Sequence, residues 1–539
     1  MSSRRSFLRQ SAAAAGAALT PALATLPSSA LLGCDDGPSL PRDLPTYEDS
    51  AASAGTGPAG LFAHGVASGD PGADSVRLWT RVSPEASPGT SPSEVPVYYE
   101  VALDPALEQR VAAGTVMAAE SRDYCVHVEL GELRWGRTYY YRFRSQGRAS
   151  VVGRTRLAPE GDVPALRFGV VACSNLAQGW FHAYAHLAQR DDLDAVLHMG
   201  DFLYESPSGT LPRAHEPPGE LVTLSDYRTR HAQYRREVEL QELLRQNPIV
   251  AVWDDHETSN NAYATGSPGH NEATEGSWAT RKAAAQQAYY EWLPVRRSED
   301  GPLHRTLRYG PLLDLVMLDT RLEGRDPQLA DLSLDTPERS LLGVAQEAWL
   351  DQQLRESSAR WVVLGQQVMV GQLDLPVENN DQWDGYASAR ERLLDSIEQH
   401  APGRTVVLTG DIHSSWANML ARAPFAPDFD PTRDALAVEF VAPGVTSPFP
   451  LPPTIGAALA RSLPDSHPHV AWANLSQRGF FTLEITRASV AADWYVLDGV
   501  AEDQGELSFA MGADVAHGQS VIALREVPLA VRRGVPPAP

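Results

Sequence analysis

The sequence predicts an α/β fold preceded by a small all-β domain. Residues from about 61 to 160 consist of short runs rich in Val, Tyr, Trp and Arg, separated by Gly, Pro and Asp, which is typical of strands joined by turns. From about residue 165, apolar runs alternate with helix-like stretches, and this alternation indicates α/β layering. The chain of 539 residues is long enough to bury more than one core.

The N-terminal residues resemble an export signal. Arg4 and Arg5 stand in a Ser-Arg-Arg-x-Phe-Leu string of the twin-arginine type, and a mild Ala-rich region follows. The residues "LLGC" resemble a bacterial lipobox, so we expect a signal peptide over 1–33 and a lipid on Cys34. A disordered basic arm and a chance cysteine are the alternatives. Residues 34–60 are polar and rich in Pro, Ser and Gly, which predicts a flexible linker.

Residues 61–160 are expected to form an N-terminal β-sandwich of the immunoglobulin or fibronectin type. Several short strand-like runs separated by turn residues are typical of that architecture. Cys125 lies inside one of the runs, where we expect it to act as a small buried apolar residue. The clearest runs are "SVRLWTRV", "VPVYYEVAL", "DYCVHVEL" and "RTYYYRFRS".

Residues 161–539 are expected to form the catalytic domain and a C-terminal tail. Its strand candidates are nearly continuous apolar runs, as expected when helices or a second sheet cover both faces. In open α/β sheets, sites lie just beyond the carboxyl ends of the strands. The six candidates are "LRFGVVAC", "LDAVLHMGD", "PIVAVWDDHE", "LLDLVMLDT", "RWVVLGQQV" and "RTVVLTGDIH".

Side chains that can bind metals follow most of these strands. Taken singly each is weak evidence, but together they offer one mixed sulfur, oxygen and nitrogen site and one all-oxygen site. Two adjacent metal ions can activate a hydroxide and hold the oxygens of a phosphoryl displacement. His198 precedes its strand end and is expected in the core, while Asp319 and Arg321 suggest a structural pair or an anion contact. The strand-end set is Cys173, Asp201, Tyr204, Asp254, Asp255, His256, Glu257, Gln366, Gln367, Asp411 and His413.

Several motifs resemble the alkaline phosphatase D (PhoD-like) family of the binuclear metallophosphatases. They are "GDFLYE", "WDDHE", "GDIHSS", "LGQQVM", "WDGY" and the longer "FAHGVASGDPGADSVRLWTRV" at 62–82. The resemblance covers about 61 to 495 and implies a metallophosphatase-type β-sandwich flanked by helices. It also implies an exported alkaline phosphatase or phosphodiesterase that hydrolyses phosphate esters by attack of a metal-activated hydroxide.

The resemblance implies roles for individual residues. A ferric ion, Fe(3+), would be held by Cys173, Asp201, Tyr204 and His413. Calcium, Ca(2+), would be held by Asp201, Asp255 and Asp411, with Gln367 and Asp384 as further oxygen ligands. His256, beside the catalytic Asp255, would contact the phosphate and donate a proton to the leaving oxygen. The alternatives are a structural, Asp-paired His256 and a nucleophilic Cys173, the latter disfavoured because the motif places no histidine base beside it.

Charge limits the range of partners. The net charge of -23 argues against nucleic acid or an anionic membrane surface as the main partner, because both require a basic face. The arginine-rich run 228–236 is expected to form an exposed helix face, with phosphate binding as the alternative. We expect a phosphate ester substrate and a monomeric, lipid-anchored protein of the periplasm or cell surface. A phosphodiesterase directed at phospholipid or cell-wall polymer, and a non-catalytic surface-binding lipoprotein, are the alternatives.

Overall fold

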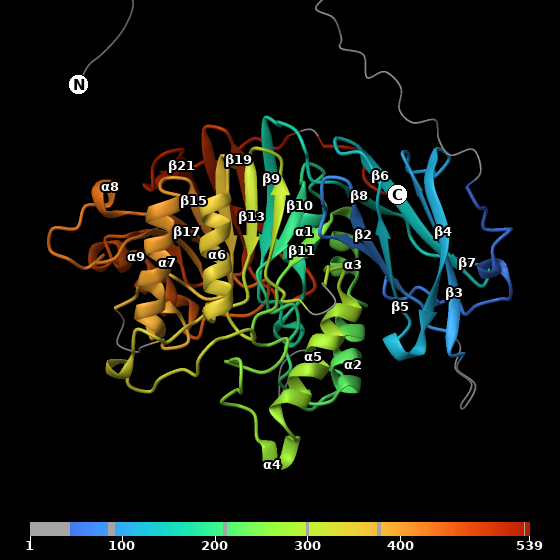
Figure 1. Ribbon diagram of the computed structural model, residues 1–539, viewed down its shortest axis with the longest axis horizontal. Helices are drawn as coiled ribbons and strands as arrows, with labels where there is room; N and C mark the ends of the chain where they lie inside the picture. The colour runs from blue at the N-terminus through green and yellow to red at the C-terminus, as the bar shows by residue number, and fades with distance from the viewer. Residues whose placement is uncertain (1–43, 85–91, 208–212, 298–300, 375–378, 533) are drawn as a thin grey trace, which may run out of the picture. The chain divides into compact units, whose positions relative to one another are not determined.

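The computed structural model describes residues 44–84, 92–207, 213–297, 301–374, 379–532 and 534–539 (Figure 1). The expected signal peptide at 1–33, the lipidated Cys34 and the linker residues up to 43 lie outside the described residues. Within these ranges, no helix combines the length and the apolar character needed to cross a membrane.

A ten-stranded mixed sheet forms one layer. Its central strands β9, β10, β11 and β1 are parallel, and the flanking strands pair antiparallel. The order across the sheet is β22 (Ala523–Arg525), β21 (Leu507–Ala516), β20 (Ser489–Leu497), β19 (Gly479–Thr486), β9 (Ala165–Val171), β10 (Ala195–His198), β11 (Ile249–Ala251), β1 (Val66–Gly69), β2 (Val76–Arg81) and β5 (Cys125–Leu130).

A seven-stranded sheet packs face to face with the first. Its residues alternate between two cores: Leu315 and Val406 face the ten-stranded sheet, whereas Val316 and Val407 face the opposite side. The strands β13, β14, β15 and β17 are parallel. The order is β12 (Arg305–Tyr309), β13 (Leu313–Met317), β14 (Trp361–Gly365), β15 (Thr405–Thr409), β17 (Ala437–Val441), β16 (Ser415–Leu420) and β18 (Val470–Asn474).

Helices cover the outer faces of this sandwich. The helices α6 (Val344–Glu356) and α7 (Ala387–His400) stand side by side on the seven-stranded sheet, where Leu350 and Leu394 join its outer core (Figure 1). On the ten-stranded sheet, α1 (His182–Ala188) comes so close to β9 that a Cβ on Gly169 would meet Leu187 at 2.7 Å. The remaining helices are α2 (Leu224–Tyr234), α3 (Val238–Gln246), α4 (Glu272–Glu275), α5 (Trp278–Trp292), α8 (Pro431–Asp434) and α9 (Pro453–Ser466).

A third sheet packs on the far edge of the ten-stranded one. Its order is β4 (Arg110–Ala119), β3 (Glu94–Ala102), β6 (Thr138–Ser145) and β7 (Arg148–Ala149), with β8 (Gly153–Arg156) also paired to β6. Val97 and Tyr141 from this sheet share a core with Leu78 and Val126 from β2 and β5. The N-terminal β domain is therefore a sandwich, as predicted, and one of its two layers continues into the large sheet.

The predicted fold class is confirmed, because strands lie at each of the apolar runs and the helices flank the sandwich. One helical expectation is wrong in part. The run 228–236 was expected to present an exposed face, but Arg230 and Arg235 have no exposed surface. The helical stretch also ends at Tyr234, and a new helix begins at Val238.

Candidate metal centre

The carboxyl ends of four strands converge between the two packed sheets. Three of these strands, β9, β10 and β11, are parallel neighbours in the ten-stranded sheet, and β15 belongs to the seven-stranded one. A bridge between Ala172 and Gly444, which follow β9 and β17, links the two sheets at this end. The residues that follow the four strands are Cys173, Asp201, Asp254 with Asp255, and Asp411 with His413.

Four of these residues have an unusual backbone conformation. Cys173, Asp201, Asp411 and His413 have φ angles of 59°, 55°, 61° and 57°, in the left-handed region that favours glycine. Such strain tends to concentrate at functional sites, where it directs a side chain that a continuing strand would point elsewhere. Here it turns side chains from two sheets toward the same space.

One group of side chains combines sulfur, oxygen and nitrogen donors. The ligand atoms of Cys173, Asp201 and His413 lie within 4.8 Å of one another. Tyr204 joins them: its hydroxyl donates to Asp201 Oδ2 at 2.9 Å, lies 3.0 Å from His413 Nε2 and accepts from Ser447 at 2.7 Å. The predicted ferric ligands therefore occupy one buried cluster.

A second set of donors shares members with the first. Asp201, Asp255 and His256 form one group, and Asp254, Asp255 and Asp411 form another, by the same 4.8 Å criterion. Asp254 Oδ2 and Asp255 Oδ1 are buried and have no hydrogen-bond partner. Because a buried carboxylate oxygen needs a partner, these two oxygens fit a bound cation.

Burial makes several acids of the cluster hard to ionise. It raises the pKa of Cys173 and of Tyr204 well above their ordinary values, and the negative charge of Asp201 adds to both effects. Burial likewise raises the pKa of Asp201, and Asp255, Glu257 and Asp411 add to the effect. A thiolate, a phenolate and a carboxylate at this place therefore need positive charge beside them.

Arg321 supplies part of that charge. Its fully buried guanidinium donates to Asp254 Oδ1 at 2.5 Å, to Asp381 Oδ2 at 2.7 Å and to Asp411 Oδ1 at 2.8 Å. Asp319, its expected partner, instead accepts from the Arg321 backbone at 2.8 Å. Asp381 also pairs with Arg325 at 2.7 Å.

Carboxyl groups outnumber cationic groups at the centre. Five aspartates, Asp201, Asp254, Asp255, Asp381 and Asp411, meet two guanidinium groups and the His256 imidazole. Sequence reasoning missed Asp381 because it lies on a loop without any strand-end pattern. The excess of carboxyl groups fits one or more metal ions.

His256 is held by a carboxylate at one end of its ring. Its Nδ1 lies 2.6 Å from Glu205 Oε2, and its ring packs against Tyr204 with 4.1 Å between ring centroids. Burial lowers the pKa of His256, but Glu205, Asp255 and Asp201 together raise it well above the ordinary value. The imidazole is thus oriented with Nε2 free of the Glu205 contact. Glu205 is a second residue that the sequence did not reveal.

The two predicted extra ligands, Gln367 and Asp384, and the neighbouring Gln366 are engaged elsewhere. Gln366 donates to Thr409, and Gln367 accepts from the backbone and hydroxyl of Thr320 at 2.8 and 2.6 Å. Asp384 accepts from the backbone of Leu373 at 3.0 Å. Both glutamine amides are thus held by protein partners, and Asp384 lies outside the groups of potential ligands.

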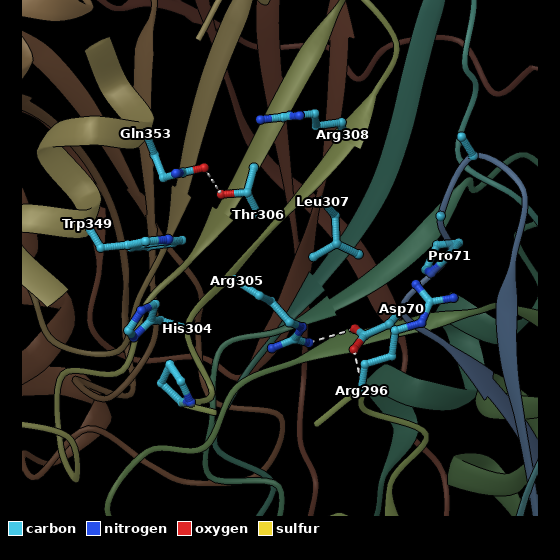
Figure 2. A pocket seen from close by; sticks show the side chains of 13 residues that line it. Asp70, Pro71, Arg296, His304, Arg305, Thr306, Leu307, Arg308, Trp349 and Gln353 are labelled. Carbon is cyan, nitrogen blue, oxygen red and sulfur yellow. Dashed lines mark hydrogen bonds and ion pairs between the residues drawn. The ribbon is translucent and has the colours of Figure 1, made fainter. Parts of the chain in front are cut away.

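A cavity of about 760 Å³ lies apart from these ligands (Figure 2). Asp70, His304, Arg305 and Trp349 line it, and none of the metal-ligand candidates does. Figure 2 shows Arg305 directed at Asp70, an ion pair of 2.7 Å. Its basic groups are thus at least partly neutralised by the protein itself.

Comparison with known proteins identifies relatives along nearly the whole described chain. Residues 168–494 match the model of the PhoD-like phosphatase family, and residues 49–159 match the model of the N-terminal domain of PhoD-like phosphatases. Alkaline phosphatase D from Bacillus subtilis (strain 168) is 38% identical over 483 residues, which cover 83% of this chain and 79% of the relative. A solved structure described as that of PhoD superimposes with a TM-score of 0.77 at 35% identity, covering 88% of this chain and 94% of the other.

Proposed function

Because the chain belongs to the PhoD-like phosphatase family and is therefore a phosphoric ester hydrolase, we propose that it cleaves phosphomonoesters and phosphodiesters at the strand-end cluster. Membership of an enzyme family sets aside the alternative of a non-catalytic binding lipoprotein. The proposal rests on one observation: the three groups of potential metal ligands are linked, because Asp201 belongs to two of them and Asp255 belongs to two of them.

We propose ferric iron for the group that contains the thiol. Cys173 and His413 offer soft or borderline donors that favour a transition metal, Tyr204 offers a phenolate oxygen that suits ferric iron, and Asp201 adds one carboxylate. Calcium suits the second group, because Asp201, Asp255 and Asp411 offer oxygen alone. Ferric iron held in this way would supply a hydroxide nucleophile near neutral pH, and both ions would supply positive charge for the phosphoryl oxygens.

The protein's own groups would orient the substrate and move a proton. Glu205 holds His256 by Nδ1, so Nε2 is the atom that can reach a phosphate oxygen or the leaving group. The carboxylates of Glu205, Asp255 and Asp201 raise the pKa of His256 and so favour a protonated imidazole. We therefore assign His256 as the general acid that protonates the leaving oxygen, with Asp255 beside it as a metal ligand.

The test is hydrolysis of 4-nitrophenyl phosphate and of its bis ester by purified protein, before and after chelation, with and without added calcium. We expect activity to fall at least 100-fold on metal removal, because the hydroxide is lost, and calcium to restore part of it. Full activity in metal-free protein would refute the proposal. Phospholipid and cell-wall polymer phosphodiesters in the same assay would define the substrate range.

Iron is tested separately. Elemental analysis is expected to find iron, and a phenolate on ferric iron should absorb visible light by charge transfer. The Tyr204→Phe variant should lose this absorption while it remains folded. A colourless, iron-free enzyme with full activity would overturn the assignment of Tyr204 but leave a calcium-dependent hydrolase possible.

We also propose twin-arginine export, removal of residues 1–33, lipidation of Cys34 and a monomeric enzyme at the periplasm or cell surface. The support is the sequence pattern "RR…LLGC" alone. A Cys34→Ser variant should leave the membrane fraction and appear as soluble exported protein. An unchanged membrane fraction would argue against the anchor.

A further inference from the structure

Arg235, just beyond α2, is buried without a partner. Its side chain has no exposed surface, and Nε, Nη1 and Nη2 have no hydrogen-bond partner. Five other fully buried arginines all donate to carboxylate or carbonyl oxygens: Arg230, Arg281, Arg321, Arg325 and Arg390. A buried guanidinium with five N–H donors and no acceptor is costly, so something must compensate it.

The surroundings of Arg235 supply no negative charge. The guanidinium lies over the ring of Trp79, 3.9 Å from its centroid, and Trp79 is fixed by a 2.8 Å bond to the Glu291 carbonyl. The acidic groups that act on it are the Cys125 thiol and the Tyr141 hydroxyl. Both are neutral near pH 7, since burial raises the pKa of each.

Arg235 itself remains charged. Burial lowers its pKa to about 9, which still leaves the guanidinium protonated at neutral pH. The attraction of the guanidinium to the Trp79 ring offsets only part of the cost of desolvating the ion.

Other polar atoms around Arg235 also lack partners. They are the hydroxyls of Ser68 and Tyr141 and the Nδ1 atoms of His64 and His231, all buried. The positive charge of Arg235 lowers the pKa of Tyr141, His64 and His231, so these side chains lie near it. The Ser68 hydroxyl lies close to that of Tyr141 and also lowers the Tyr141 pKa. Burial lowers the pKa of both histidines to about 3, so neither adds positive charge.

We propose that a small monovalent anion, such as chloride, binds against the Arg235 guanidinium, with the hydroxyls of Tyr141 and Ser68 as further donors. One negative charge balances the one guanidinium in otherwise neutral surroundings, whereas a divalent anion would leave a net charge buried. Both hydroxyls can turn their hydrogen toward the ion.

The position of the site indicates a structural role. Ser68 lies in β1, Tyr141 in β6, and Arg235 follows α2, so the anion would join the large sheet, the N-terminal sheet and a helix. In the same helix α2, Arg230 donates to the backbone carbonyl of Tyr204. We therefore expect the anion to affect the stability of the whole fold and to have little effect on the chemical step.

Bromide is the direct probe. Crystals of the full-length protein grown with sodium bromide in place of chloride should give an anomalous peak in contact with the Arg235 guanidinium. Refined water there, or no peak while bromide occupies surface positions, would overturn the proposal. This measurement uses the unaltered protein and does not depend on whether a variant folds.

Thermal unfolding at constant ionic strength is the second test. Replacing sodium gluconate by sodium chloride should raise the melting temperature by about 1–3 °C if the site has a millimolar Kd. Arg235→Met should lose this increment. The matched control is Arg390→Met, which removes a buried arginine that has its own acceptors and should keep the increment. A chloride response that persists in Arg235→Met would contradict the proposal.

Discussion

At Cys173, the protein places a thiol where its own groups would not ionise it. Burial, Asp201, Asp254 and Asp411 all raise the pKa of the thiol. The buried guanidinium of Arg321 is engaged by aspartates. An unassisted thiolate nucleophile is therefore disfavoured, whereas a bound ferric ion would deprotonate the thiol and use it as a ligand.

The Cys173→Asp variant separates these two roles. Aspartate tolerates the left-handed conformation better than most residues and supplies an oxygen ligand. We expect it to retain iron and to lose about 10- to 100-fold in activity, the loss typical of disturbed metal sites. Elemental analysis and the rate with 4-nitrophenyl phosphate measure both.

The control for this variant is Cys125→Ala. Cys125 is also a buried free thiol, but it lies in β5, outside the groups of potential ligands. Its replacement should leave iron content and rate unchanged. Full iron content with no detectable turnover in Cys173→Asp would instead identify Cys173 as the nucleophile.

At the scale of elements, one carboxylate joins two of the strand-end loops. Glu257 accepts from the backbone of Phe202 at 2.6 Å and Asp201 at 3.1 Å, beyond β10. It also accepts from Asp254 at 2.9 Å, beyond β11. These bonds hold the Asp201 and Asp254 backbones in register, so Glu257 positions ligands without being in the groups of potential ligands itself.

Glu257→Gln is therefore expected to weaken metal binding. The amide presents N–H groups where backbone N–H groups already point, so at least one of the three bonds is lost. Metal affinity should fall about 10- to 100-fold, the usual cost of changing a group that orients ligands. Excess metal should restore much of the activity, which a merely unfolded variant would not show. Glu291→Gln, in α5, is the control and should bind metal normally.

The strands and ligands were predictable, but the groups that support them were not. Apolar runs mark each strand, and parallel strands bring their carboxyl ends to one edge, so Cys173, Asp201 and Asp411 could be grouped before the structure. Glu205 and Asp381 act across long sequence separations, and no local pattern marks them. Arg321 was noticed beside Asp319, but its partners Asp254, Asp381 and Asp411 lie far away in the sequence. The buried Arg230 and Arg235 were expected on a surface because the helix pattern does not show what covers them. Arg230 is bound by the carbonyls of Tyr204 and Glu216, and Arg235 lies over Trp79 of β2.

At the scale of the whole molecule, the N-terminal sandwich and the catalytic domain share one sheet, although the sequence suggested two separate domains. Strand β1 pairs in parallel with β11, about 180 residues later in the chain, and thereby joins the N-terminal sandwich to the catalytic sheet. Pairings of this kind bury polar groups deep in the protein. Four histidines in the resulting cores, His64, His127, His198 and His231, have a pKa lowered to about 3 by burial.

These histidines make the stability of the molecule depend on pH, and His198 allows a test. The imidazole of His198 takes up a proton below about pH 6.5 in the unfolded chain, but only near pH 3 in the folded protein. Protonation therefore favours the unfolded chain, so the folded protein is not destabilised by His198 above pH 6.5 and loses stability as the pH falls toward 3. In His198→Gln, the free energy of unfolding should vary less steeply with pH between 6 and 4.5, by up to about 1.4 kcal/mol per pH unit. Buried carboxyl groups such as Asp319, whose pKa burial raises to about 6, act in the opposite sense.

The quantity to measure is therefore the difference in the free energy of urea unfolding between the variant and the wild type at each pH. Parallel pH profiles would show that His198 is protonated in the folded protein, contrary to the expectation from its burial and its 2.9 Å contact with Tyr184.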